Sequence, residues 1–266
     1  LLETIDRTLK EMRHAPATLL QAEAGMPPRV VNILVHNFHV DDDIVIRSAH
    51  RLDLADWIAL HRIPLPHLKD APFTPRALWL PQRDPCIFDD IREEDYLVHH
   101  PFDSFSAFEL FLKQAATDPQ VVAIKMTIYR TGPESELMET LIAAARAGKV
   151  VTVVVELLAR FDEEANINWA ARLEEAGAHV VYGVVGHKTH AKMALVVRRE
   201  EMKLKRYVHL STGNYHPRTT RLYSDFGLFT CNEEICAEVN DVFMQLTGLG
   251  RASKLKHLWQ SPFTLH

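Results

Sequence analysis

The chain has 266 residues, 47% hydrophobic and 24% charged, an ordinary globular composition with enough apolar residues for one sizeable core or two smaller ones. Three cysteines are too few for a disulfide scaffold, and no apolar run is long enough to span a bilayer. The net charge of −5 gives little reason to expect a general polyanion binder.

Residues 1–97 differ in pattern from the rest of the chain. Leu1–Met12 has apolar residues at a helical period, and Val30–Phe38 is apolar and β-branched. Leu52–Leu60 is predicted to be a short helix, with Asp53 as its N-cap. A proline-rich stretch follows, which predicts extended backbone. We interpret this part as the end of one domain followed by a linker.

From Asp103 onward the chain alternates between helical and strand patterns, which is typical of a parallel sheet covered by helices. Val121–Ile128 and Val150–Leu157 are predicted to be strands, and their near-continuous apolar runs Val121–Ile124 and Val150–Val155 agree, because such strands are buried on both faces. Lys192–Val197 and Tyr207–Ser211 are predicted to form a pair of strands. The predicted fold class is α/β, with a mixed, mainly parallel sheet flanked by helices. The remaining predicted elements are the helices Asp103–Ala116, Ser135–Ala147, Glu163–Ala176 and Glu233–Leu246 and the strand His179–Gly183.

Two basic residues at the start of an apolar strand form the first candidate site. His190 and Lys192 lie two residues apart, so on a strand their side chains project from the same face. The ammonium group would attract phosphate and help to keep the imidazole neutral and therefore nucleophilic. On these residues alone, an exposed pair without a function is the better interpretation.

Small polar residues close a second strand at Ser211–Tyr215. The hydroxyls, the Asn214 amide and the backbone N–H groups could bind a phosphate, although an ordinary turn has the same sequence pattern. H-x-K followed by Gly-Asn at a second strand end resembles the phospholipase D superfamily, and the combination is far more specific than either part. Hydrolases of that superfamily usually carry an aspartate where this chain has Val197, which argues against hydrolysis.

Arg130 and Arg160 each follow a predicted strand. Ligands of open parallel sheets bind beyond the carboxyl ends of the strands, and two guanidinium groups there suit a bidentate phosphate clamp. The alternatives are a salt bridge of Arg160 with a neighbouring acid and an exposed turn for Arg130. Basic charge gathers nearby, since residues 186–221 contain nine Lys and Arg residues, four histidines and two acids.

Several strings of the sequence resemble polyphosphate kinases of the bacterial type that carries phosphate on a histidine. They occur in the family's order and together extend from about Asp95 to Thr230. The resemblance implies an enzyme that moves the γ-phosphate of ATP reversibly to inorganic polyphosphate. The strings are His99–Phe105, Ala123–Arg130, Val155–Glu163, Lys188–Lys192, Ser211–Tyr215 and Leu222–Asp225.

The resemblance also implies roles for individual residues. His190 would take the phosphate, with Lys192 and Asn214 beside it in the catalytic site. Arg130 and Arg160 match arginines of the Mg²⁺–phosphate site; because arginine has no acceptor atom, we expect both to contact phosphate oxygens, with Mg²⁺ bound mainly by ATP.

Tyr223 matches a tyrosine at the ATP site, where its ring would stack on the adenine. Without the resemblance, a core tyrosine with a hydrogen-bonded hydroxyl is the expected role.

The domain limits that the resemblance implies are residues 1–97 for the end of an α+β head domain with its linker, 98–260 for a first phospholipase D-like catalytic domain, and 261–266 for the start of a truncated second one. The complete enzyme would be a cytoplasmic homo-oligomer, able to associate with the inner face of the membrane, with no nucleic-acid partner. The fragment alone would be inactive because one wall of its cleft is missing.

The alternative functions are a phospholipase D-like phosphodiesterase and a module that binds polyphosphate or nucleotides without catalysis.

Overall fold

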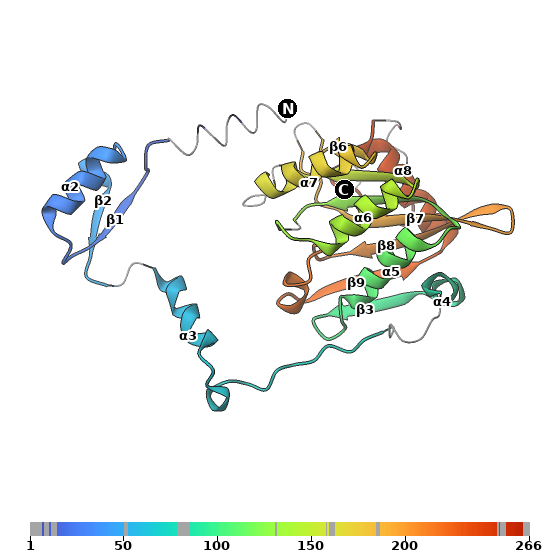
Figure 1. Ribbon diagram of the computed structural model, residues 1–266, viewed down its shortest axis with the longest axis horizontal. Coiled ribbons are helices and arrows are strands. Elements are labelled where there is room, and N and C mark those ends of the chain that lie inside the picture. The colour runs from blue at the N-terminus through green and yellow to red at the C-terminus, as the bar shows by residue number, and fades with distance from the viewer. Residues whose placement is uncertain are drawn as a thin grey trace. The chain divides into compact units, whose positions relative to one another are not determined.

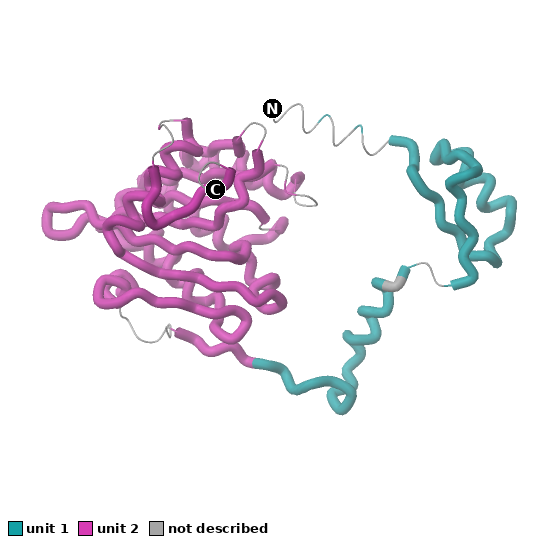
Figure 2. The backbone as a smooth tube through the Cα atoms, turned by 180° about the vertical axis from the view of Figure 1, so that it is seen from behind, with its two compact units in different colours: residues 1–73 teal, residues 74–266 magenta. Residues whose placement is uncertain are grey.

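The chain divides into two compact units, residues 1–73 and 74–266, which are coloured separately in Figure 2. Most of the predicted helix Leu1–Met12 lies outside the residues described. The computed structural model describes residues 15–50, 53–78, 86–130, 132–157, 163–184, 187–248 and 254–262, together with Arg7, Glu11, Ala159 and Gly250.

Unit 1 contains a small parallel sheet in which β1 (Leu20–Glu23) pairs with β2 (Val45–Ser48). The helix α2 (Pro28–Asn37) lies between them in the chain. The apolar, β-branched run Val30–Phe38 is therefore mostly helical. Proline at the first position of a helix supplies a suitable φ, and no N–H bond is lost there, so Pro28 favours a helix start at this point.

Short helical turns follow in unit 1. Asp53 accepts a hydrogen bond from the backbone N–H of Ala55 at 2.8 Å and caps the 3₁₀ turn η2 (Leu54–Trp57). The helix α3 (Ile58–Arg62) continues directly from it, so the predicted short helix with its Asp53 cap is confirmed over the residues described. Two further 3₁₀ turns are η1 (Asp42–Ile44) and η3 (Pro66–Leu68).

A seven-stranded mixed sheet forms the centre of unit 2 (Figure 1). Its strands are β3 (Tyr96–His100), β4 (Val121–Ile128), β5 (Val150–Val155), β6 (His179–Tyr182), β7 (Lys192–Glu200), β8 (Lys203–Ser211) and β9 (Asp225–Thr230). Their order is β3-β9-β8-β7-β4-β5-β6, and only the pairs β4–β5 and β5–β6 are parallel. The α/β prediction is confirmed, but the prediction of a mainly parallel sheet is wrong: among the described strands, antiparallel pairs are the majority.

A tight hairpin is one cause of this antiparallel part. Glu201 and Met202 join β7 to β8 with φ values of +44° and +68°, and a two-residue turn with both φ positive reverses the chain directly. The predicted pairing of these two strands is confirmed. The register places Lys192 opposite Ser211, so the two polar strand ends singled out in the sequence lie side by side.

The helices of unit 2 cover both faces of the sheet, with α5, α6 and α7 on one face and α8 on the other (Figure 1). Their bounds are α4 (Ile87–Glu93), α5 (Ser106–Thr117), α6 (Glu136–Arg146), α7 (Glu163–Glu175) and α8 (Glu233–Leu246), with a 3₁₀ turn η4 at Thr219–Arg221. Glycines with φ of +85° at Gly148 and +88° at Gly177 follow α6 and α7, at the positions where the sequence predicted the helix ends. Among the described residues, no helix is long and apolar enough to cross a membrane.

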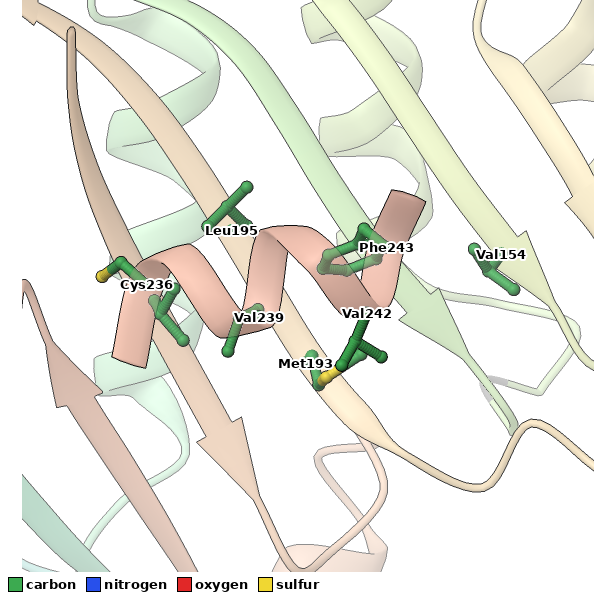
Figure 3. Packing of buried hydrophobic residues seen from close by; sticks show 8 residues of the cluster. Val154, Met193, Leu195, Cys236, Val239, Val242 and Phe243 are labelled. Atoms are coloured by element: carbon green, nitrogen blue, oxygen red, sulfur yellow. The ribbon is translucent and has the colours of Figure 1, made fainter. Parts of the chain in front are cut away.

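The face of the sheet under α8 holds a hydrophobic core of unit 2. Met193 and Leu195 alternate along β7 and meet Val239, Val242 and Phe243 of α8, as Figure 3 shows. Asn232 caps α8, because its side chain accepts hydrogen bonds from two backbone N–H groups of the first turn. This packing holds the start of β7, which carries the candidate residues, against a rigid helix.

Two elements of unit 2 fall in the region that the sequence indicated to be linker. The strand β3 pairs antiparallel with β9 at one edge of the sheet, and α4 buries Ile87, Phe88 and Ile91. The break between the two units lies at residue 73, whereas the limit of 97 for the head domain and its linker, like the limits of 98–260 and 261–266, remains a prediction.

A buried histidine makes the stability of unit 2 depend on pH. His209 is 1% exposed, and its Nδ1 lies 3.1 Å from the hydroxyl of Tyr215. Burial, and secondly the nearby His100, lower the pKa of His209 from 6.5 to about 3. The unfolded state therefore binds a proton that the folded state does not. The contribution of His209 to stability is complete above pH 6.5 and is lost as the pH falls toward 3, at up to about 1.4 kcal/mol per pH unit.

We expect urea unfolding between pH 7 and pH 4.5 to show this loss, and His209→Gln to reduce the pH slope. The NMR titration of the His209 ring in the folded protein provides a second measurement that does not depend on the variant. Protonation of this ring near pH 6.5 in the folded state would show the explanation to be wrong.

Candidate functional site

A cavity of about 670 Å³ opens where β7 begins and β8 ends. Basic and hydroxyl side chains line it together with apolar side chains of α8 and of the segment after α8. This combination suits a ligand that carries both an anionic and an apolar part. The polar residues include His187, Lys188, His190, Lys192 and Ser211, and the apolar residues include Val242, Leu246, Leu255 and Leu258.

Lys192 is a buried cation that lines this cavity. Its side chain is 6% exposed, and its Nζ donates to the backbone carbonyl of His190 at 2.6 Å. Burial lowers the pKa of Lys192 to about 8, although the charge of Asp225 raises it. A buried ammonium with a lowered pKa gains more from a bound anion than an exposed one would, because an anion compensates its lost hydration.

His190 is exposed, lines the same cavity and contacts an aromatic ring. Its imidazole meets the ring of Tyr129 edge-on at 4.9 Å, and the Lys192 Nζ lies 5.2 Å from the centre of the same ring. Partial desolvation, followed by the charges of Lys192 and Lys188, lowers the pKa of His190. The imidazole is therefore mainly neutral near pH 7 and has a free lone pair for nucleophilic attack.

The backbone that carries this pair is fixed by the side chain of Thr127. Its hydroxyl donates to the Ala191 carbonyl at 2.7 Å and accepts from the Met193 N–H at 3.0 Å. Thr127 lies near the end of β4 and is 2% exposed. The hydroxyl thus continues the pairing of β4 with β7 beyond Met126–Ala194, where their regular register ends.

The loop after β8 needs glycine for steric reasons. A Cβ atom on Gly213 would overlap the carboxyl group of Asp225, whose Oδ1 accepts from the Thr212 hydroxyl at 2.8 Å. Asn214 follows, and its buried amide oxygen has no hydrogen-bond partner among the described residues. Gly213 is therefore packed against the start of β9, and Asn214 is not among the residues that line the cavity.

The two arginines predicted to clamp phosphate have different outcomes. Arg130 follows β4 directly after Tyr129 and is half-buried, but it is not among the residues that line the cavity. Arg160 lies outside the described residues. The strands that precede them do end together, because Ile128 pairs with Val155 in the parallel register of β4 and β5.

Tyr223 lies in the loop before β9 with 62% of its surface exposed. This exposure rules out the alternative interpretation as a core tyrosine. Its ring is outside the lining of the cavity, so the structure brings His190 and Lys192 together but does not add Tyr223 to them.

Sequence reasoning missed the roles of Tyr129 and Asp225. Tyr129 contacts His190 and Lys192 from a neighbouring strand, and Asp225 acts on the charge of Lys192 from the far side of β8. No spacing along the chain indicates such contacts, although both residues stand inside strings that resemble the family. Among the described residues there is no group of three His, Cys, Asp or Glu side chains that could hold a metal ion. The mainly cationic side chains here do not suit a directly bound Mg²⁺.

An α/β unit with a histidine of lowered pKa and a buried lysine in a cavity at adjoining strand ends has the chemistry of a protein that handles phosphate groups. Residues 86–252 match the family described as polyphosphate kinase C-terminal domain 1. The chain therefore belongs to the polyphosphate kinase family.

Individual relatives agree with this assignment. The chain is 55% identical to a polyphosphate kinase of Burkholderia ambifaria and 53% identical to one of Paraburkholderia phytofirmans, in each case over 94% of this chain and 37% of the relative. The crystal structure of polyphosphate kinase from Porphyromonas gingivalis matches with a TM-score of 0.70 and 32% identity, over 90% of this chain and 38% of that one. The chain thus spans a little over a third of the length of these relatives.

Proposed function

We propose that the protein containing this chain transfers the γ-phosphate of ATP reversibly to inorganic polyphosphate through a phosphohistidine at His190. The observation that carries the proposal is the neutral imidazole of His190 next to the buried Lys192 in a cavity at the strand ends. A ring nitrogen attacks the γ-phosphorus, so that a P–N bond forms while the P–O bond to ADP breaks. A terminal oxygen of polyphosphate then attacks the same phosphorus, and the P–N bond breaks.

Two steps through the imidazole divide one displacement between two polyanions into two easier ones. The protein contributes position and positive charge, which are the main sources of catalysis in phosphoryl transfer. Lys192 and Asn214 would contact the transferred phosphate, and Arg130 and Arg160 would contact other phosphate oxygens. Mg²⁺ would enter with the phosphates of ATP. We also propose that the catalytic unit is phospholipase D-like and that the whole protein is a cytoplasmic homo-oligomer.

The three functions considered from the sequence give different results in one experiment. The full-length protein that contains this chain is given ATP, polyphosphate primer and, separately, a phosphodiester. A kinase forms ADP and longer polymer in equal phosphate amounts and runs backward with excess ADP. Diester cleavage would indicate a hydrolase, and binding without turnover would indicate a binding module; either result would overturn the proposal.

Tyr223 provides a separate prediction about the nucleotide. If its exposed ring stacks on adenine, Tyr223→Ala weakens ATP binding by about 1–3 kcal/mol, the range for base–aromatic stacking. Tyr223→Phe keeps the ring face and is expected to bind ATP almost as the wild type does. Calorimetric titration of full-length protein measures both affinities. Thermal unfolding confirms that each variant is folded, and unchanged ATP affinity in a folded Ala variant removes Tyr223 from the site.

A further inference from the structure

A buried carboxylate holds the segment that carries His190. Glu156 is the first residue after β5 and is 3% exposed. Its Oε2 accepts a hydrogen bond from the backbone N–H of Thr189 at 2.7 Å, one residue before His190. The backbone of Glu156 is itself fixed, because its N–H donates to the Ile128 carbonyl at 2.9 Å.

A second buried side chain connects the backbone of Glu156 with that of Tyr129. Asn166 of α7 is fully buried, and its Nδ2 donates both to the Glu156 carbonyl at 2.9 Å and to the Tyr129 carbonyl at 3.0 Å. Tyr129 is the residue whose ring meets the imidazole of His190. The residue that bonds Thr189 and the residue whose ring contacts His190 are therefore both bonded to α7 through their backbone carbonyls.

The hydrogen bond to Thr189 points to a role of Glu156 in position. Its Oε2 accepts from a backbone N–H, so the bond fixes the segment directly before His190. Gly183 lies next to the carboxylate, and a Cβ atom added to it would meet Oε2 at 3.5 Å. Partial desolvation and the charges of Lys192 and Lys188 lower the pKa of His190.

We propose that Glu156 is a positioning residue for His190, which holds the backbone at Thr189 so that the imidazole stays aligned with the phosphorus it attacks. The proposal rests on the proposed function for its effect on rate, but not for its effect on structure. Misplacing a reacting group by about 1 Å can reduce a rate on the order of 100-fold. A buried backbone N–H that loses its partner destabilises the closed state of its segment, so that the segment opens to water more often.

Amide hydrogen exchange of residues 187–192 in the 266-residue chain tests whether Glu156 holds the backbone at Thr189. Glu156→Ala is expected to speed the exchange of the Thr189 amide by about tenfold or more, because the acceptor is lost. Glu156→Gln keeps an acceptor oxygen at the same place and is expected to restore protection. Unchanged protection of Thr189 in the Ala variant would overturn the proposal.

Glu200 provides a matched control at the far end of β7. It is a largely buried carboxylate that accepts from the Tyr207 hydroxyl at 2.6 Å and from Arg198 at 2.8 Å. It lies eight positions after Lys192, which is about 26 Å along an extended strand. Glu200→Ala is expected to lower the unfolding temperature without changing the exchange of Thr189.

The same variants in the full-length protein test the effect of Glu156 on the phosphorylation of His190. We expect the rate of His190 phosphorylation by saturating ATP to fall on the order of 100-fold in Glu156→Ala, to be largely kept in Glu156→Gln, and to be normal in Glu200→Ala. The KM for ATP should change little, because Glu156 contacts no nucleotide in the proposed reaction. A Gln variant as slow as the Ala variant would contradict positioning through this hydrogen bond.

The two proposals fail in different ways. If wild-type protein forms no phosphohistidine, the proposed function is wrong, while the exchange of the Thr189 amide still decides whether Glu156 holds the segment. If the wild type is phosphorylated and Glu156→Ala reacts at the same rate, the function stands and the positioning role is wrong.

Discussion

His190→Gln is expected to abolish both phosphoenzyme formation and polymer synthesis in a full-length kinase that contains this chain. Glutamine is polar and of similar length, but its amide nitrogen has no lone pair available for attack on phosphorus. His190 is exposed, and its ring contacts only the edge of Tyr129 among the described aromatic rings, so the variant should fold normally. Labelling by γ-labelled ATP, a polymer assay and thermal unfolding measure the three expectations.

His179→Gln is the matched control. His179 is an exposed histidine at the start of β6, and this point lies at the end of the sheet opposite to the start of β7. It should be labelled normally and make polymer at the wild-type rate. Normal labelling of His190→Gln would show that another residue takes the phosphate.

Arg130→Ala is expected to have the second largest effect. Loss of one charged contact to the transferring phosphate raises the transition-state barrier by about 2–4 kcal/mol, which is roughly a 30-fold to 1000-fold loss of rate. The rate of Arg130→Lys should lie between those of the wild type and Arg130→Ala, because lysine keeps the charge but not the bidentate geometry. The same expectation applies to Arg160→Ala. Turnover at saturating Mg-ATP measures the effect on the chemical step.

Arg146→Ala serves as the control for these variants. Arg146 is exposed at the end of α6, just before β5 begins, and therefore lies at the edge of the sheet opposite to the end of β4. It should turn over normally. If Arg130→Ala and Arg160→Ala also keep wild-type turnover, both arginines return to the surface roles considered from the sequence.

Local features of the sequence predicted much of unit 2. Strand β4 has the predicted bounds, Val121–Ile128, because the apolar, β-branched start of this segment favours a strand covered on both faces. Gly148 and Gly177 mark helix ends because each adopts a positive φ that favours glycine. The candidate pair His190 and Lys192 lies on one strand, where a spacing of two residues is sufficient to predict a shared face.

Sequence patterns did not predict the contacts between distant segments. Strand β7 runs antiparallel to β4, and no local pattern in its sequence indicates that direction. Strand β3 contains two histidines and lies beside prolines, so its pairing with β9 has no local signal. Glu156 and Tyr129 act across strands, and a buried carboxylate bonded to a backbone N–H leaves no periodic pattern.

The most direct test of the central claim is to incubate the full-length protein with ATP labelled in either the γ or the α position and to map the label by peptide sequencing. We expect an acid-labile label on His190 from the γ position alone, discharged by polyphosphate or by ADP. Label from the α position, label on a different residue, or a folded protein that takes up no label would contradict it.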